Sequence, residues 1–175
     1  GLSRDAWDRY SGGRAWDYRI VAPGYKYNLT DVAAAIGVHQ LKRAETMRAA
    51  RERRAVEYLE QLAGVTAIEL PPTDANRLHS WHLFPIKLHL EQLSIDRNRF
   101  IDELKDAGIG CSVHWRPLHL HPYHQERFGW TPDDLPVATA QFDRIVSLPL
   151  FSTMTDQDVA AVVDTVRSIT ARFRR

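Results

Sequence analysis

Residues 23–45, PGYKYNLTDVAAAIGVHQLKRAE, pass from a turn with two tyrosines into a helix that begins at Thr30 or Asp31. Thr30 is a favourable N-cap residue, and Asp31 complements the positive end of the helix dipole. Apolar residues then recur every three or four positions as far as Leu62. Because a helix of about 33 residues spans ~50 Å, we predict a long linking helix over residues 30–64 that joins two domains.

Short strands and helices are expected after this helix. The first strand is expected within residues 79–90, HSWHLFPIKLHL, where Pro85 indicates an edge strand or a bulge. One face of this strand is expected to carry His82, Phe84, Ile86 and Leu88.

The rest of the chain predicts a small α+β domain over residues 65–175, with helices on one face of a short sheet. A capping box at Thr155 and Asp158 begins the last helix, in which valines recur at helical spacing. Before it we expect a helix over residues 95–108, a strand over 109–115, a loop over 116–134, a helix over 135–145 and a strand over 146–150.

The composition excludes several classes of protein. The 23 basic and 22 acidic residues nearly cancel, so the broad positive field of a nucleic-acid-binding protein is missing. No apolar run approaches ~20 residues, and the first residues lack a signal-peptide pattern. The single cysteine, Cys111, excludes an internal disulfide framework and fits a reducing compartment. We therefore expect a cytoplasmic protein with neither a membrane nor a nucleic-acid partner.

The first 29 residues are rich in aromatic side chains and contain only one short strand-like run. Such a segment has aromatic surface to bury and little structure of its own to bury it against. We expect residues 1–29 to be a remnant of a larger domain. The aromatic residues in question are Trp7, Tyr10, Trp16 and Tyr18.

The most conspicuous polar cluster lies on the proline-rich loop. A zinc site is one hypothesis, because imidazole and thiolate are good zinc ligands, but the spacing matches no common zinc motif. Contact with an anion is favoured over zinc, since Arg116 offers a planar fork that matches a phosphate. The alternative is a solvated loop that Trp115 and Tyr123 tie down. The cluster comprises His114, Arg116, His119, His121, Tyr123 and His124, with Cys111 just upstream.

The turn before the long helix is a second candidate for anion binding. Backbone N–H groups at a helix start are partly positive, and Asn28 can donate to a phosphate oxygen there, although it can equally serve only to shape the turn. Lys26 would form an imine only if burial lowered its pKa, and the flanking Tyr25 and Tyr27 are as easily packing residues. Hydrolase and nucleotide-triphosphatase functions have no motif here, since neither GxSxG nor a glycine-rich phosphate loop occurs.

Taken in order, five segments resemble the C-terminal part of the DegT/DnrJ/StrS family of pyridoxal-phosphate-dependent nucleotide-sugar aminotransferases. They are GLSRDAW, PGYKYNLTDVAAAIGVHQLKR, HSWHLFPIKL, RFIDELKDAGIGCSVHWRPLHLHPYH and IVSLPLFSTMTDQDV, and they cover nearly the whole chain. GYKYNLTD and HLF are especially similar to the branch that aminates 4-keto sugars, including the enzyme that makes UDP-4-amino-4-deoxy-L-arabinose. The resemblance implies an α/β fold, the C-terminal part of a fold type I pyridoxal-phosphate transferase.

The same resemblance implies roles for individual residues. Two subunits share each active site in this family, so Asn28 is expected to reach the cofactor phosphate of a partner subunit, with Tyr25 and Lys26 beside it. The resemblance also favours part of the proline-rich loop as surface near the sugar nucleotide. The loop residues expected to bind substrate are His114, Arg116, His119 and Tyr123.

One feature of the family is missing from the sequence. Family members hold the cofactor through a Schiff-base lysine, and an aspartate pairs the pyridine nitrogen; both lie in segments upstream of the point where this chain begins. Without them the electron sink cannot be assembled, so we expect no catalytic residue here and no transamination by this chain alone. A homodimer, or complementation by a separate N-terminal chain, is expected. The lysines outside the family's cofactor context are Lys26, Lys42, Lys87 and Lys105.

The reaction implied by the resemblance transfers an amino group from an amino acid, usually glutamate, to a nucleotide-linked keto sugar. A sugar dehydratase that uses the same cofactor is the alternative within the family. The alternative from another class is a non-catalytic module that retains a dimerisation or sugar-nucleotide-binding surface. No metal is expected in any of these readings.

Overall fold

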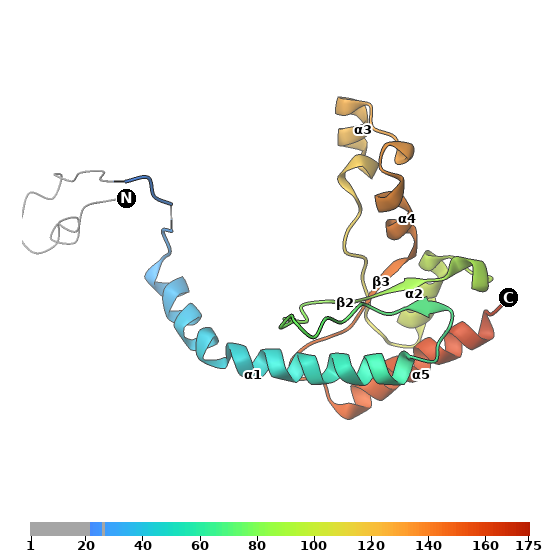
Figure 1. Ribbon diagram of the computed structural model, residues 1–175, viewed down its shortest axis with the longest axis horizontal. Helices are drawn as coiled ribbons and strands as arrows, with labels where there is room; N and C mark the ends of the chain where they lie inside the picture. The colour runs from blue at the N-terminus through green and yellow to red at the C-terminus, as the bar shows by residue number, and fades with distance from the viewer. Residues whose placement is uncertain (1–21, 26) are drawn as a thin grey trace, which may run out of the picture. The chain divides into compact units, whose positions relative to one another are not determined.

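The computed structural model describes residues 22–25 and 27–175, and the chain divides into two units between Lys42 and Arg43. Within the described residues, no helix is both long enough and apolar enough to cross a membrane. Along the chain the elements are α1 (Asp31–Leu62), β1 (Ile68–Glu69), β2 (Phe84–Leu88), η3 (Leu90–Gln92), α2 (Arg97–Asp106), η4 (Leu118–Leu120), α3 (Pro122–Phe128), η5 (Pro132–Asp134), α4 (Pro136–Arg144), β3 (Ile145–Leu148) and α5 (Asp156–Arg172), the η elements being 3-10 helices (Figure 1).

The long helix expected from Thr30 is confirmed as α1. The Oγ1 atom of Thr30 accepts a hydrogen bond from the backbone N–H of Ala33 at 3.3 Å, which caps the helix. The helix ends at Leu62, two residues before Gly64. The expected division of the chain into residues 1–29, 30–64 and 65–175 stays a prediction.

The second unit, which we call the lobe (Arg43–Arg175), contains an antiparallel sheet in the order β1-β2-β3. Phe84, Ile86 and Leu88 of β2 are fully buried, as expected, while Pro85 and Lys87 on the opposite face are half-buried. The alternation shows that one face of the sheet is covered by the core. On the other face, Glu69 forms ion pairs with Lys87 and Arg144.

Pro85 does not mark an edge strand, so that expectation is wrong: β2 is the central strand. Proline is tolerated because the backbone N–H and C=O groups of Ser147, the partner of Pro85 on β3, both bond to Ser112 on the far side. Pro85 and Ser147 therefore form a non-hydrogen-bonded pair, so the lack of an N–H group on Pro85 removes no hydrogen bond to β3. On its other side β1 pairs only with Lys87 and Leu88 and does not reach Pro85.

Three further expectations are wrong in part. His82 is exposed and precedes β2, because the strand begins only at Phe84. Residues 109–115 form no strand but a single bridge between Ser112 and Ser147. The supposed loop 116–134 contains a helix, α3, since Pro122 occupies its first turn and Gly129, with φ 69°, ends it in the left-handed region.

Helices α1, α2 and α5 supply most of the rest of the core. Tyr58 of α1 and Phe100 and Leu104 of α2 are fully buried, and the Tyr58 ring lies 5.0 Å from the Phe84 ring. The capping box of α5 is present as expected, with Thr155 Oγ1 accepting from the N–H of Asp158 at 3.2 Å. The buried residues of α5 are Val159, Val162, Val163, Val166, Ile169 and Thr170.

Candidate functional site

The turn before α1 exposes its aromatic side chains. Tyr25 is 86% and Tyr27 83% exposed, and their rings contact each other with centroids 5.8 Å apart. Lys26 lies outside the described residues. Tyr25 and Tyr27 therefore have their apolar surface available to another molecule.

Asn28 follows on the same turn and is also exposed. Among the described residues its side-chain amide makes no hydrogen bond, whereas the N–H of Ala33 is already taken by Thr30. The amide of Asn28 and the first N–H groups of α1 are thus donors that a phosphate group can accept from. The residues present fit the role that the resemblance implies for Asn28.

His114 is anchored to the sheet. Its Nδ1 atom lies 2.9 Å from Oγ of Ser147, a buried residue of β3, and its ring is half-buried. Cys111 and His82 border the same hollow, which has a volume of about 330 Å³. Burial raises the pKa of the Cys111 thiol, so the thiol stays protonated at neutral pH.

Arg116 is exposed and lies over the ring of Phe142 on α4, with its guanidinium carbon 5.3 Å from the ring centroid. Its one hydrogen bond among the described residues is a long one, 3.4 Å, to the carbonyl of Leu120. The guanidinium of Arg97, at the start of α2, lies over the same ring at 4.8 Å. Two cations therefore share one aromatic ring.

His119 lies inside the lobe, with 1% of its surface exposed. Its Nε2 atom is 2.8 Å from Oγ1 of Thr139, and that hydroxyl donates its own hydrogen to the carbonyls of Pro132 and Leu135. We therefore assign the proton of His119 to Nε2. The Nδ1 atom of His119 is buried without a partner among the described residues. His119 ties η4 to α4 and is not a surface group.

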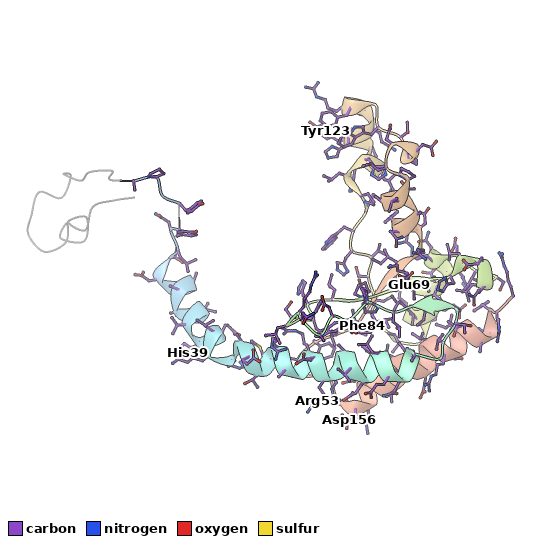
Figure 2. All side chains as sticks on the ribbon, viewed as in Figure 1. His39, Arg53, Glu69, Phe84, Tyr123 and Asp156 are labelled. Atoms are coloured by element: carbon purple, nitrogen blue, oxygen red, sulfur yellow. The ribbon has the colours of Figure 1, made fainter. Side chains whose placement is uncertain are left out.

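Tyr123 projects from α3 and is 67% exposed (Figure 2). The ring of the neighbouring His124 stacks with those of Phe128 and Trp130, with both ring centroids 5.7 Å away, and the Phe128 and Trp130 centroids are 5.1 Å apart. Of the predicted substrate residues, then, His114, Arg116 and Tyr123 have accessible surface, and no hydrogen bond joins any two of the four within residues 22–25 and 27–175. In the same part of the chain, no three His, Cys, Asp or Glu side chains are grouped so that they can hold a metal ion.

The described lysines are unlike imine-forming lysines, whose ammonium groups are desolvated. Lys42 and Lys105 are exposed, and the ammonium group of Lys87 pairs with Glu69. Each of these lysines is therefore either solvated or neutralised by a carboxylate.

Two features of the lobe could not be expected from the sequence. The first is Arg97, for which the sequence predicts a position on a helix but no functional role. The second is a hollow of about 800 Å³ between α1 and the segment after β1. Its lining includes Val56, Leu59 and Trp81, which come from separate parts of the chain, so no local pattern could have indicated it.

Comparison with known proteins shows extended similarity. Residues 1–167 match the DegT/DnrJ/EryC1/StrS aminotransferase family. Uncharacterized protein MJ1066 of Methanocaldococcus jannaschii is 45% identical over 174 residues, which are 99% of this chain and 45% of that protein. Spore coat polysaccharide biosynthesis protein SpsC of Bacillus subtilis is 39% identical over 170 residues, 97% of this chain and 44% of that protein. The chain thus spans less than half the length of both relatives.

Solved structures show the same likeness. The PMP-form of the putative sugar aminotransferase Spr1654 from Streptococcus pneumoniae has a TM-score of 0.79 and 29% identity, over 98% of this chain and 42% of that one. Its PLP-form has a TM-score of 0.76 and 30% identity, over 90% and 40%. For PseC of Helicobacter pylori the TM-score is 0.78 over 93% and 43%, and its 22% identity supports the fold alone. The fold expected from the resemblance is confirmed.

Proposed function

The chain belongs to the DegT/DnrJ/EryC1/StrS aminotransferase family, and from this premise we propose that it is part of an enzyme that transfers an amino group from glutamate to a nucleotide-linked keto sugar. The match to this family over residues 1–167 carries the proposal. The relatives named above include a polysaccharide biosynthesis protein and a putative sugar aminotransferase, which supports a sugar as the acceptor.

Pyridoxal phosphate, when bound, supplies the electron sink for amino transfer. In our proposal Asn28 of one subunit donates a hydrogen bond from its side-chain amide to the cofactor phosphate held by a second subunit. This role is supported by two observations: Asn28 is exposed, and it lies just before Asp31, the first residue of α1. Tyr25 and Lys26 are proposed to contribute to the same contact, and the Tyr25 ring contacts the Tyr27 ring.

The loop of the lobe is proposed to face the sugar nucleotide. Arg116 is exposed and keeps its donors largely uncommitted, so its guanidinium can bind a diphosphate in two-point fashion. His114 and Tyr123 present polar atoms from the same segment. His119, being buried, is proposed to hold the loop in position through Thr139 rather than to touch substrate.

We further propose that the lysine that binds the cofactor lies outside this chain. Lys42 and Lys105 are solvated, Lys87 is neutralised by Glu69, and Lys26 is assigned in this proposal to the contact with the cofactor phosphate. The active form, called the assembled enzyme below, then combines this chain with a lysine-bearing cofactor domain, on one polypeptide or two, in a homodimer. The chain alone is expected to be inactive.

The test is an assay of the assembled enzyme, loaded with pyridoxal phosphate, using glutamate and a UDP-linked 4-keto sugar. We expect 2-oxoglutarate and the amino sugar in equal amounts, measured by coupled absorbance and mass spectrometry. Release of 2-oxoglutarate without an amino sugar, tried across keto sugars of several nucleotides, would contradict the proposed acceptor. The 175-residue chain assayed alone serves as the negative control.

A further inference from the structure

The two buried arginines of the lobe differ in whether a carboxylate pairs with the guanidinium group. Arg54 is 5% exposed and forms ion pairs with Glu57 at 2.8 Å and Asp156 at 2.5 Å. Arg97 is 9% exposed and forms no ion pair among the described residues. A buried charge without a counter-ion is costly, so the unpaired state of Arg97 needs an explanation.

The guanidinium group of Arg97 has hydrogen-bond donors without an acceptor among the described residues. Its Nε atom donates to Oδ1 of Asn98 at 2.9 Å, and its Nη1 atom is enclosed without a hydrogen-bond partner among the described residues. The ring of Phe142 beneath it offers a cation–π contact but accepts no strong hydrogen bond. The guanidinium group thus retains donors that the described part of the chain leaves unused.

The second cation makes the arrangement more unusual. Burial lowers the pKa of Arg97, and the positive charge of Arg116 lowers it further, whereas the pKa of Arg54 is raised by hydrogen bonds to its carboxylates. Asp143 and Asp96 act in the opposite direction on Arg97, but neither forms an ion pair with it. Both guanidinium groups lie within 5.3 Å of the centroid of the Phe142 ring, and an anion bound by both would offset the repulsion between their charges.

We propose that Arg97 and Arg116, placed over Phe142, together form a binding site for an oxyanion, with Arg116 as the exposed entrance and Arg97 as the fixed base. The ligand is a phosphate or carboxylate group, which guanidinium forks bind in a planar, two-point manner. Within the proposed function, on which this assignment of sources rests, the oxyanion is either the diphosphate of the sugar nucleotide or a carboxylate of the amino-acid donor.

Calorimetric titration of the 175-residue chain with sodium pyrophosphate, and separately with L-glutamate, tests the site. Saturable binding of at least one anion is expected. Arg97→Met and Arg116→Ala should each weaken it at least tenfold, and Arg97→Lys, which keeps the charge and loses the fork, should weaken it severalfold. Arg127→Ala, which removes an exposed arginine of α3, should bind as the unmodified chain does.

The outcomes are distinct. Tighter binding of pyrophosphate assigns the site to the diphosphate, and tighter binding of glutamate assigns it to the donor. Absence of saturable binding of both anions, or equal binding by the Arg116→Ala and Arg127→Ala variants, overturns the proposal. Should Arg97→Met fail to fold by near-ultraviolet circular dichroism, Arg97→Lys and Arg116→Ala still decide. Because no turnover is measured, this result is independent of the transamination assay.

Discussion

The two halves of α1 carry similar apolar patterns in opposite environments. In the half that belongs to the first unit, the large apolar side chains are exposed to solvent; in the half that belongs to the lobe, the apolar side chains that face the core are enclosed. The exposed fractions are 74% for Val32, 59% for Ile36 and 76% for Leu41, against 0% for Ala55, Tyr58 and Leu62. Helical periodicity therefore identifies a face that needs a partner, but it does not say whether the same chain supplies that partner.

The difference separates two kinds of contribution to function. The lobe has its own core and can hold Arg97, Arg116 and His119 in fixed positions. The turn with Asn28 and the exposed half of α1 present polar and apolar groups to solvent. We accordingly expect substitutions in the two regions to change different measurements.

The largest effect on stability is expected at Tyr58. Replacing it with alanine removes a fully buried ring that contacts Phe84, and the hydrogen bond of its hydroxyl to the carbonyl of Pro149 at 3.0 Å. The free energy of unfolding should fall by about 3–5 kcal/mol. Urea denaturation, followed by circular dichroism, measures it. Leu41→Ala, in the exposed half, should change the unfolding free energy by about 0.5 kcal/mol at most, and equal losses would abolish the distinction between the halves.

Arg54→Ala is expected to have an intermediate effect. Nε of Arg54 donates to the backbone carbonyl of Met154 at 3.0 Å, and its Nη1 atom joins α1 to Asp156 at the start of α5. Loss of these bonds leaves a buried carbonyl unpaired, so the unfolding free energy should fall by about 1–3 kcal/mol. The neighbouring Arg53 is exposed, and Arg53→Ala is the matched control. A similar loss in both variants would show that the Arg54 contacts are not stabilising.

The smallest effect is expected from the helix caps. Thr155→Ala should lower the stability of the lobe by about 1 kcal/mol, whereas Thr30→Ala, in the exposed half of α1, should leave the unfolding midpoint of the lobe unchanged. Denaturation monitored by the near-ultraviolet signal, which reports the buried aromatics of the lobe, distinguishes the two.

The contribution of Thr155 should depend on pH. Hydrogen bonds from the backbone and hydroxyl of Thr155 lower the pKa of Asp158 below its ordinary value of 3.8. A lowered folded-state pKa stabilises the fold above the unfolded value, and the contribution is lost as pH falls through the folded value. The difference between Thr155→Ala and the unmodified chain should be constant from pH 5 to 7 and shrink below about pH 4. A difference as large at pH 2 as at pH 7 would contradict this origin, because only the cap bond from the N–H of Asp158 to Oγ1 of Thr155 is independent of pH.

Elements with a strong local signal could be predicted from the sequence. The cap at Thr30, the box at Thr155 and the alternation around Ile86 depend on residues within a few positions of one another. The central position of Pro85 could not be predicted, because it depends on which backbone groups of Ser147 are used by another segment.

The candidate site was predictable in part for the same reason. Asn28 and Arg116 stand out by residue type and by their place in a turn or loop. The burial of His119 depends on Thr139, and the position of Arg97 depends on Phe142. Such contacts between segments distant in the chain leave no periodic pattern in the sequence, so the sequence analysis counted His119 as a surface ligand and gave Arg97 no role.

The most direct test of the division between the regions compares Asn28→Ala with Arg116→Ala in the assembled enzyme. Loss of one charge-assisted hydrogen bond, about 1.5–3 kcal/mol, should weaken pyridoxal phosphate binding by Asn28→Ala roughly tenfold to a hundredfold, with the KM for the nucleotide sugar unchanged. Arg116→Ala should raise that KM and leave cofactor affinity unchanged. Cofactor affinity that does not respond to Asn28→Ala, or a KM that does not respond to Arg116→Ala, would contradict the account.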